Sequence, residues 1–265
     1  MYSRWQLAKQ YLQYYYSAAN SKGHGVHSPF VYDFIRQVLN DERRFYAYYY
    51  IEQLRTQLLA NEAVLDVEDL GAGSVTTKTR QRSVASIAEH AAKPKKWAQL
   101  LFRIVHYYQP QHILELGTSL GVSTAYMSLA NPNAQIITGE GSKEVAAQAR
   151  KNFGDLFLNN VELVEGNFDD TLPAMIKRMP SIDLAFVDGN HRYEPTMRYF
   201  HQLLPAMSAS SMIIFDDIHW SEEMLQAWTE IQQHPSVMLT VDLFFIGLVF
   251  FRDDFKIKQH FAIRH

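Results

Sequence analysis

Short apolar runs alternate with longer mixed segments along the chain after residue 110. Runs of strand length separated by segments of helical length are typical of βαβ units and a parallel sheet. The runs are nearly continuous in apolar residues, as expected for strands covered on both faces. The predicted strands are 112–116, 135–139, 161–164, 182–187 and 211–215, and the predicted helices are 121–130, 142–153, 170–178, 194–204 and 221–233.

Two more apolar runs, 237–243 and 245–251, lie close together near the end of the chain. They are too close for a helical crossover, so we expect them to pair antiparallel. The pattern therefore predicts the α/β class, with a doubly wound, mostly parallel seven-stranded sheet and a C-terminal antiparallel hairpin.

The first part of the chain has helical patterns instead, at 4–17, 29–39, 43–60 and 94–108. Ser28 could cap the second of these helices, with Pro29 at its first position. We therefore expect a helical N-terminal cap or extension over residues 1–109 and a second domain over residues 110–265.

Tyrosine is concentrated at the N-terminus, where residues 1–50 hold ten of the fifteen tyrosines. Amphipathic rings can form the walls of an acceptor site or fill a dimer interface. The sequence does not choose between these two interpretations.

Composition narrows the class of protein. The 265 residues are 47% hydrophobic and 20% charged, as in a globular protein with a full core. The absence of cysteine excludes disulfides, thiolate metal sites and a cysteine nucleophile. No apolar run reaches the roughly 18 residues of a membrane span, and the N-terminus does not resemble a signal peptide. We therefore expect a cytoplasmic protein with no membrane partner. The net charge of −3 also lacks the basic field of a general nucleic-acid binder.

Weaker features lie before residue 110. The stretch 76–96 is basic, either as a solvated face or as a rim that attracts an anionic substrate. A second glycine-rich segment, Gly71 to Ser74, is interpreted as a turn because no acid ends a strand about 20 residues later. His24 and His27 are expected to be packing residues rather than part of a lid. The basic residues of 76–96 are Lys78, Arg80, Arg82, Lys93, Lys95 and Lys96, against one acid, Glu89.

A loop with two glycines follows the first predicted strand. Gly117 allows a sharp turn, and Gly121 opens a helix whose free N–H groups favour a polar or anionic group. Glu115 precedes the loop inside the strand, and Glu140 ends the next strand, 23 residues after Gly117. A carboxylate there can accept hydrogen bonds from both hydroxyls of a ribose. The alternative for Glu140 is a favourable charge at a helix N-terminus.

This pattern, E-x-G-x-x-x-G-x-S followed by an acid at the end of the second strand, resembles the class I S-adenosylmethionine-dependent methyltransferases over residues 94–251. The resemblance implies that the loop wraps the methionine end of the cofactor and that Glu140 binds its ribose. Gly166, Asn167 and Phe168 match the family's adenine-contact position. The predicted cofactor-binding residues are Glu115, Gly117, Thr118, Ser119, Gly121, Ser123, Glu140, Gly141, Ser142, Gly166, Asn167, Phe168 and Asp188.

Carboxylates follow the fourth and fifth predicted strands, at Asp188 and at the pair Asp216-Asp217. Oxygen ligands at adjacent strand ends suit Mg²⁺, Ca²⁺ or Mn²⁺, so these three aspartates are the candidate metal ligands. Asp188 and Asp217 could instead cap helices, and Asp216 could point away, because neighbours alternate sides in an extended segment. His219 and Trp220 are expected to form a pocket wall or core.

The acidic ends resemble metal-dependent O-methyltransferases. Catechol and caffeoyl-coenzyme A O-methyltransferases carry Asp-Asn after strand five, from which Asp216-Asp217 departs. Antibiotic-tailoring sugar O-methyltransferases are more similar, with an acidic pair and an Asp-x-x-His that corresponds to Asp188 to His191. The resemblance implies that His191 is the general base, with Asp188 also catalytic. Alternatively, His191 is a loop residue that forms a hydrogen bond with the backbone.

The expected function is methyl transfer from S-adenosylmethionine to a small molecule, at a hydroxyl oxygen, with assistance from a divalent cation and in a homodimer if the tyrosines form an interface. Three alternatives stay open. The first is a metal-free N- or C-methyltransferase of the same fold. The second is a nicotinamide-dependent dehydrogenase, although Ser119 stands where G-x-G-x-x-G needs its second glycine. The third is a non-catalytic cofactor-binding protein.

Overall fold

The computed structural model describes residues 2–23, 26–68 and 80–265. Its main sheet has eight strands in the order β10-β8-β9-β7-β6-β3-β4-β5, so the α/β prediction is confirmed and the predicted number of seven strands is wrong by one. The chain divides into two compact units, residues 1–40 with 179–265 and residues 41–178. The predicted division at residue 110 is a different partition and stays a prediction.

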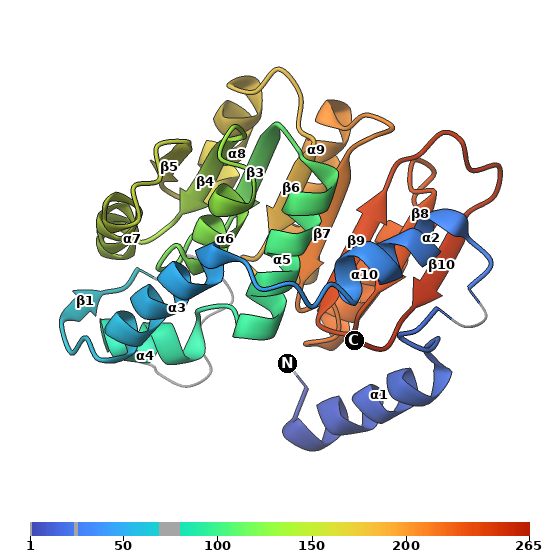
Figure 1. Ribbon diagram of the computed structural model, residues 1–265, viewed down its shortest axis with the longest axis horizontal. Coiled ribbons are helices and arrows are strands. Elements are labelled where there is room, and N and C mark those ends of the chain that lie inside the picture. Colours follow the sequence, from blue (N-terminus) through green and yellow to red (C-terminus); the bar gives the residue numbers. More distant parts are fainter. Residues whose placement is uncertain (1, 24–25, 69–79) are drawn as a thin grey trace. The chain divides into compact units, whose positions relative to one another are not determined.

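The second unit, residues 41–178, contains three parallel strands (Figure 1). Helices α6 and α7 connect them, as the alternating pattern predicts. In the register of β3 and β4, Glu115 lies opposite Thr138 and Leu116 lies opposite Gly139. The strands are β3 (His112–Leu116), β4 (Gln135–Glu140) and β5 (Val161–Glu165), and the helices that follow them are α6 (Val122–Ala130), α7 (Lys143–Asp155) and α8 (Phe168–Lys177).

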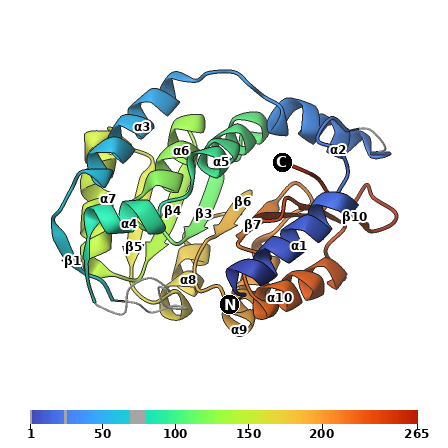
Figure 2. The same cartoon turned by 90° about the horizontal axis from the view of Figure 1, so that it is seen from below.

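Helices from the N-terminal side of this unit pack against α6. Helix α5 (Lys95–Tyr108) is buried on every side from Leu100 to Val105 and lies beside α6 (Figure 2). Helix α3 (Tyr46–Leu59) also contacts α6, where the Tyr126 hydroxyl donates to Glu52 at 2.7 Å. Three short elements were not predicted, because strands of three residues and a helix of seven residues carry too little periodicity to detect. They are β1 (Val64–Asp66), β2 (Gln81–Ser83) and α4 (Val84–His90).

The first unit contains the other five strands of the sheet. Strands β6 and β7 are parallel, and β9 pairs antiparallel with both β7 and β8, so the predicted C-terminal hairpin is confirmed. Strand β10 pairs parallel with β8 and was not predicted, since its sequence QHFA has no strong apolar pattern. The elements are β6 (Leu184–Val187), α9 (Tyr193–Leu203), β7 (Met212–Asp216), α10 (Glu222–Gln233), β8 (Leu239–Asp242), β9 (Ile246–Phe250) and β10 (Gln259–Ala262).

The same unit includes the N-terminal helices. Helix α1 (Arg4–Ser17) has its predicted bounds, and α2 (Pro29–Phe34) continues as a π-helix over Ile35–Leu39. Ser28 is the N-cap residue of α2, but its side chain makes no capping hydrogen bond, so that detail of the prediction is wrong. Its hydroxyl is buried and makes no hydrogen bond with the described residues. Within the described residues, no helix is long and apolar enough to cross a membrane.

Candidate functional site

The glycine loop of the second unit turns sharply between β3 and α6. Gly117 and Gly121 have φ values of 104° and 79°, and Ser119 has a φ of 49°. The N–H groups of Gly117 and Thr118 both donate to the carbonyl oxygen of Gly139, each at 3.0 Å. The loop is therefore anchored to β4, and its conformation requires glycine at the two positions where the sequence places it.

Glu140 closes the loop from the end of β4. Its Oε2 accepts a hydrogen bond from the Ser119 N–H at 2.8 Å, and its Oε1 accepts one from the Ser142 N–H at 2.9 Å. Burial raises the pKa of Glu140, and the backbone donors oppose that rise. Each carboxylate oxygen has a second lone pair, so the group retains the capacity to accept from ribose hydroxyls. Gly141 lies in the bend before Ser142, which is the buried N-cap residue of α7.

We expect Glu140→Gln to weaken S-adenosylhomocysteine binding about tenfold or more, because the amide turns an N–H₂ group toward a donor. Calorimetric titration with S-adenosylhomocysteine and with its 2′-deoxy analogue measures the effect. The wild type should prefer the ribose form, and the variant should lose that preference. An unchanged preference in the variant would contradict ribose binding and leave Glu140 only the role of holding Ser119 and Ser142.

Glu115 lies beneath the loop and is fully buried. Its carboxylate accepts hydrogen bonds from the hydroxyls of Ser123 at 2.6 Å, Thr124 at 2.5 Å and Thr138 at 2.7 Å. The structure thus gives Glu115 and Ser123 a clear part in joining β3, β4 and the start of α6. Thr138 was not singled out from the sequence. The available signal was a polar residue in the apolar strand QIITGE.

Burial raises the pKa of Glu115 to about 7, although the three hydroxyls and the charge of Lys93 lower it. The folded protein therefore keeps a proton between about pH 4.5 and 7 that the unfolded chain loses, and stability from this group falls as the pH rises. We expect the free energy of unfolding of the wild type to fall between about pH 5 and 8.5 by about 2–3 kcal/mol more than that of Glu115→Gln. Urea unfolding at both pH values measures this. Parallel pH dependence of the two proteins would contradict it.

The predicted adenine position lies at the end of β5. The Gly166 N–H donates to the carbonyl oxygen of Glu140 at 2.9 Å, which places this turn beside the end of β4. Asn167 is the N-cap residue of α8 and accepts from the Asp169 N–H at 3.1 Å. The Phe168 ring lies against Gly139, where an added Cβ would be 3.3 Å from it. Gly166, Asn167 and Phe168 are therefore gathered next to Glu140, as the resemblance implies.

Two further residues that the sequence did not reveal support the loop from α7. The side-chain amide of Asn152 donates to the carbonyl oxygen of Leu120 at 2.9 Å. The ring of Phe153 packs so closely on Gly121 that an added Cβ would be 2.3 Å from it. The contact explains why position 121 requires glycine for space as well as for its backbone angle.

In the first unit, the ends of β6 and β7 bring together Asp188, His191 and Asp216. One ligand atom from each lies within 4.8 Å of the others, and His191 Nε2 is 3.8 Å from Asp188 Oδ1. Asp216 is buried and does not point away from its partners. Asp217, predicted to be a ligand, is not part of this group of described residues. Its φ of 53° ends the extended strand directly after Asp216.

His219 lies in an aromatic cluster of the same unit. Its Nε2 is 2.8 Å from Asp242 Oδ2, and its ring stacks on Phe244 with centroids 4.8 Å apart. Asp242 also accepts from the Trp228 indole N–H at 3.1 Å and from the Phe244 N–H at 2.8 Å. These contacts agree with the prediction that His219 is a core residue.

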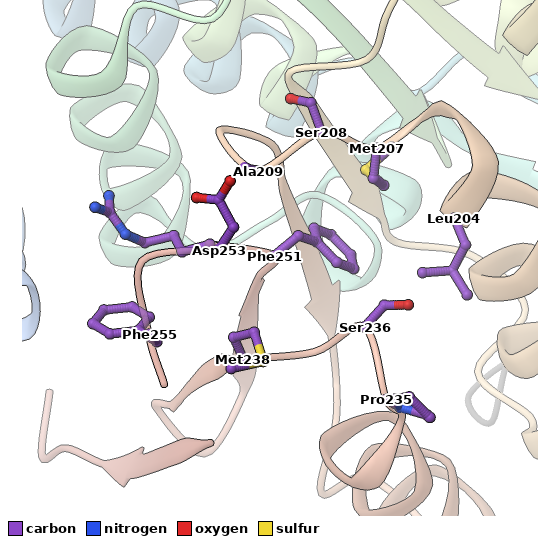
Figure 3. Close-up of a pocket in the computed structure, with 11 residues that line it drawn as sticks. Leu204, Met207, Ser208, Ala209, Pro235, Ser236, Met238, Phe251, Asp253 and Phe255 are labelled. Atoms are coloured by element: carbon purple, nitrogen blue, oxygen red, sulfur yellow. The ribbon is translucent and has the colours of Figure 1, made fainter. Parts of the chain in front are cut away.

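A cavity of about 500 Å³ in the first unit lies elsewhere (Figure 3). Its walls come from segments 204–209, 235–238 and 251–255, which precede β7 and β8 and follow β9. It therefore lies at the opposite end of these strands from Asp216. We do not assign it to the candidate site.

Some of the weaker sequence features lie outside the described residues, namely His24, Gly71 to Ser74 and Lys78. His27 is exposed. In the basic stretch, Arg80 pairs with Asp66 at 3.3 Å and with Glu68 at 3.6 Å, while Lys93 is buried. Arg80 is thus already paired and Lys93 is covered, which leaves less charge for an anion-attracting rim, the alternative to a solvated face.

Comparison with known proteins identifies the segment that holds both groups. Residues 114–218 match a family described as "Methyltransferase domain". The segment is similar to this family and makes up less than half of the chain. It contains every predicted site residue from Glu115 to Asp217, and it confirms the family resemblance that the glycine loop indicated.

Two curated relatives are 32% identical to this chain over the residues that align. Catechol O-methyltransferase B of Danio rerio aligns over 42% of this chain and 47% of its own length. Catechol O-methyltransferase of Niastella koreensis aligns over 46% of this chain and 55% of its own length. The chain thus spans about half the length of the curated relatives it matches.

A solved structure supports the fold of nearly the whole chain. The S-adenosylhomocysteine-bound methyltransferase PaMTH1 of Podospora anserina superposes with a TM-score of 0.60 and 16% identity. The superposition covers 96% of this chain and 98% of the other. At this identity the likeness shows that the two chains share a fold.

Proposed function

We propose that this protein transfers a methyl group from S-adenosylmethionine to a hydroxyl oxygen of a small molecule. The observation that carries the proposal is the methyltransferase match over residues 114–218, which includes the glycine loop and the strand-end carboxylates. The names of the curated relatives, catechol O-methyltransferases, support a small hydroxyl acceptor. The match also favours this reaction over the dehydrogenase and over a non-catalytic role.

The proposal assigns the cofactor to the second unit. Gly117, Thr118, Ser119 and Gly121 are placed to wrap its methionine end, and Glu140 to accept from its ribose. Their backbone is held by β4, so little ordering remains to be done when the cofactor binds. Such preorganisation fits methyl transfer, where alignment of an oxygen with the methyl carbon supplies much of the rate.

The proposal assigns acceptor activation to Asp188, His191 and Asp216. Two carboxylates and one imidazole suit a hard divalent cation such as Mg²⁺ or Mn²⁺. Ligand atoms on opposite sides of an ion lie about 4.0–4.2 Å apart for Mg²⁺ and up to about 5.2 Å apart for Ca²⁺. Those of the three residues lie within 4.8 Å of one another. A bound cation would supply positive charge that stabilises a deprotonated acceptor hydroxyl.

Within the proposal, proton transfer is the alternative to cation binding for His191, since an imidazole nitrogen bound to a cation cannot also accept a proton. An imidazole titrates near neutral pH and can take the proton of the acceptor hydroxyl, as the resemblance to the sugar O-methyltransferases implies. Asp188, whose Oδ1 is 3.8 Å from His191 Nε2, would then orient the ring and stabilise its charged form. The cytoplasmic location and the small-molecule partner expected from the sequence belong to the same proposal.

An assay that measures the S-adenosylhomocysteine formed from S-adenosylmethionine tests the function, with catechol as the probe acceptor. We expect turnover that rises with Mg²⁺ and falls with EDTA. Turnover that persists in EDTA but is lost in His191→Gln would assign His191 to proton transfer and contradict the cation. If S-adenosylhomocysteine fails to bind at all, the methyltransferase proposal is wrong, whereas binding without catechol methylation changes only the acceptor.

A further inference from the structure

Helix α1 has two apolar faces, and only one of them packs against other residues that the structure describes. Leu7, Tyr14 and Ala18 share one side and form a hydrophobic cluster with Phe244. The Tyr14 hydroxyl also donates to the carbonyl oxygen of Ile263. This inner face attaches α1 to the rest of the first unit, and Figure 1 shows α1 at the margin of that unit.

The outer face carries large side chains in solvent. Trp5 is 87% exposed, Leu12 is 54% exposed and Tyr16 is 79% exposed. The spacing i, i+7, i+11 places these three residues on one side of a helix, directly opposite Tyr14. Single exposed apolar residues are ordinary, but an aligned stripe on the solvent side of a helix marks an interaction surface.

The charged side chains of the N-terminal segment that carries this stripe have one sign. Residues 1–32 contain Arg4, Lys9 and Lys22 and no aspartate or glutamate, although the whole chain has a net charge of −3. Arg4 and Lys9 are exposed on α1 beside the stripe. Tryptophan and tyrosine favour the boundary between water and lipid, and basic residues on such a helix attract anionic headgroups.

A second copy of the chain fits this surface less well. A twofold interface would set α1 against itself and bring Arg4 and Lys9 of both copies together without any acid from the helix. The stripe also has only three side chains on a helix about 21 Å long. A stable interface uses about 20–30 residues from each partner.

We propose that the outer face of α1 docks on an anionic lipid surface. Trp5, Leu12 and Tyr16 enter the headgroup region, and Arg4 and Lys9 face the lipid charges. Electrostatic attraction from so few basic residues is weak, so the attachment is reversible. The proposal revises the expectation of no membrane partner, and it involves surface attachment without a spanning helix.

Vesicles of phosphatidylcholine with phosphatidylserine test the proposal, with phosphatidylcholine vesicles as the neutral reference. Trp5 is the natural probe, since Trp97 and Trp228 are buried and Trp220 is partly buried. We expect a blue shift of Trp5 emission and sedimentation with the anionic vesicles only. The shift should be absent in Trp5→Phe, and both signals should weaken in about 0.5 M salt because the charges are screened.

The variant Leu12→Ser/Tyr16→Ser should weaken vesicle binding about tenfold or more. A matched control is Tyr46→Ser/Tyr50→Ser, which removes two exposed rings at the same spacing from α3 and should bind as the wild type does. Unchanged affinity for S-adenosylhomocysteine would show that both variants are folded. Equal binding of the wild type to neutral and anionic vesicles, or of Leu12→Ser/Tyr16→Ser and wild type, would overturn the proposal. A dimer that Leu12→Ser/Tyr16→Ser dissociates, without lipid binding, would assign the surface to a second copy.

Discussion

Replacement of Asp216 by asparagine is expected to lower turnover on the order of 100-fold or more, with little change in affinity for S-adenosylhomocysteine. The amide would keep the shape of the side chain but lose the charge that, in our proposal, holds the cation or stabilises charged His191. Asp216 is buried and lies with Asp188 and His191, so water has little access to compensate for the lost carboxylate charge. Single-turnover methylation and calorimetric titration of the cofactor product separate the two effects.

The adjacent residue is a matched control for this prediction. Asp217→Asn removes the same charge one position later, at a residue with a φ of 53° that asparagine tolerates well. We expect Asp217→Asn to retain most of its turnover. Titration with Mn²⁺ gives a second readout, in which Asp216→Asn should lose affinity and Asp217→Asn should not. The reverse order of the two variants would restore the ligand that the sequence analysis predicted and exclude Asp216.

Gly121→Ala is expected to destabilise the protein by about 2–5 kcal/mol, from a left-handed alanine and from overpacking. The φ of Gly121 is 79°, and an added Cβ would lie 2.3 Å from the Phe153 ring. Either the loop or α7 must move, and both border the predicted cofactor site. We therefore also expect affinity for S-adenosylhomocysteine to fall about tenfold or more. Urea unfolding and calorimetric titration measure the two effects.

Gly154 provides the control for this second prediction. It belongs to α7, directly after Phe153, and an added Cβ there would meet no atom within 4 Å. Gly154→Ala should stabilise the helix by about 0.5–1 kcal/mol and leave cofactor affinity unchanged. In a Phe153→Leu background, Gly121→Ala should cost less than in the wild type. The same cost in both backgrounds would show that the backbone angle, and not the contact with Phe153, determines the effect.

The order of helices and strands after residue 110 could be predicted from the sequence because it depends on local periodicity. Apolar runs and their spacing determine each element almost independently of its neighbours. The predicted hairpin is confirmed for the same reason, since two strands so close in the chain have little choice of partner. Strand β10 was missed because its sequence QHFA has no strong apolar pattern. Its pairing with β8 uses backbone groups, which every sequence provides.

The candidate site shows a similar division. Gly117, Gly121 and Glu140 could be found from the sequence because their backbone angles and their place after a strand follow from local pattern. The choice between Asp216 and Asp217 could not be made, since it depends on the side to which each carboxylate points where β7 ends. Only the folded chain shows that the left-handed turn at Asp217 leaves Asp216 with Asp188 and His191.

By itself, the sequence determined that the chain is an α/β protein with a glycine loop of the methyltransferase type, since periodicity and glycine positions are local properties. The tertiary structure alone decided which distant groups meet. Glu115 accepts a hydrogen bond from Thr138 on the neighbouring strand, and Gly121 packs against the Phe153 ring. Among the described residues of the first unit, the outer face of α1 has no partner element. These outcomes depend on register and packing between segments far apart in the chain, and no local pattern specifies them.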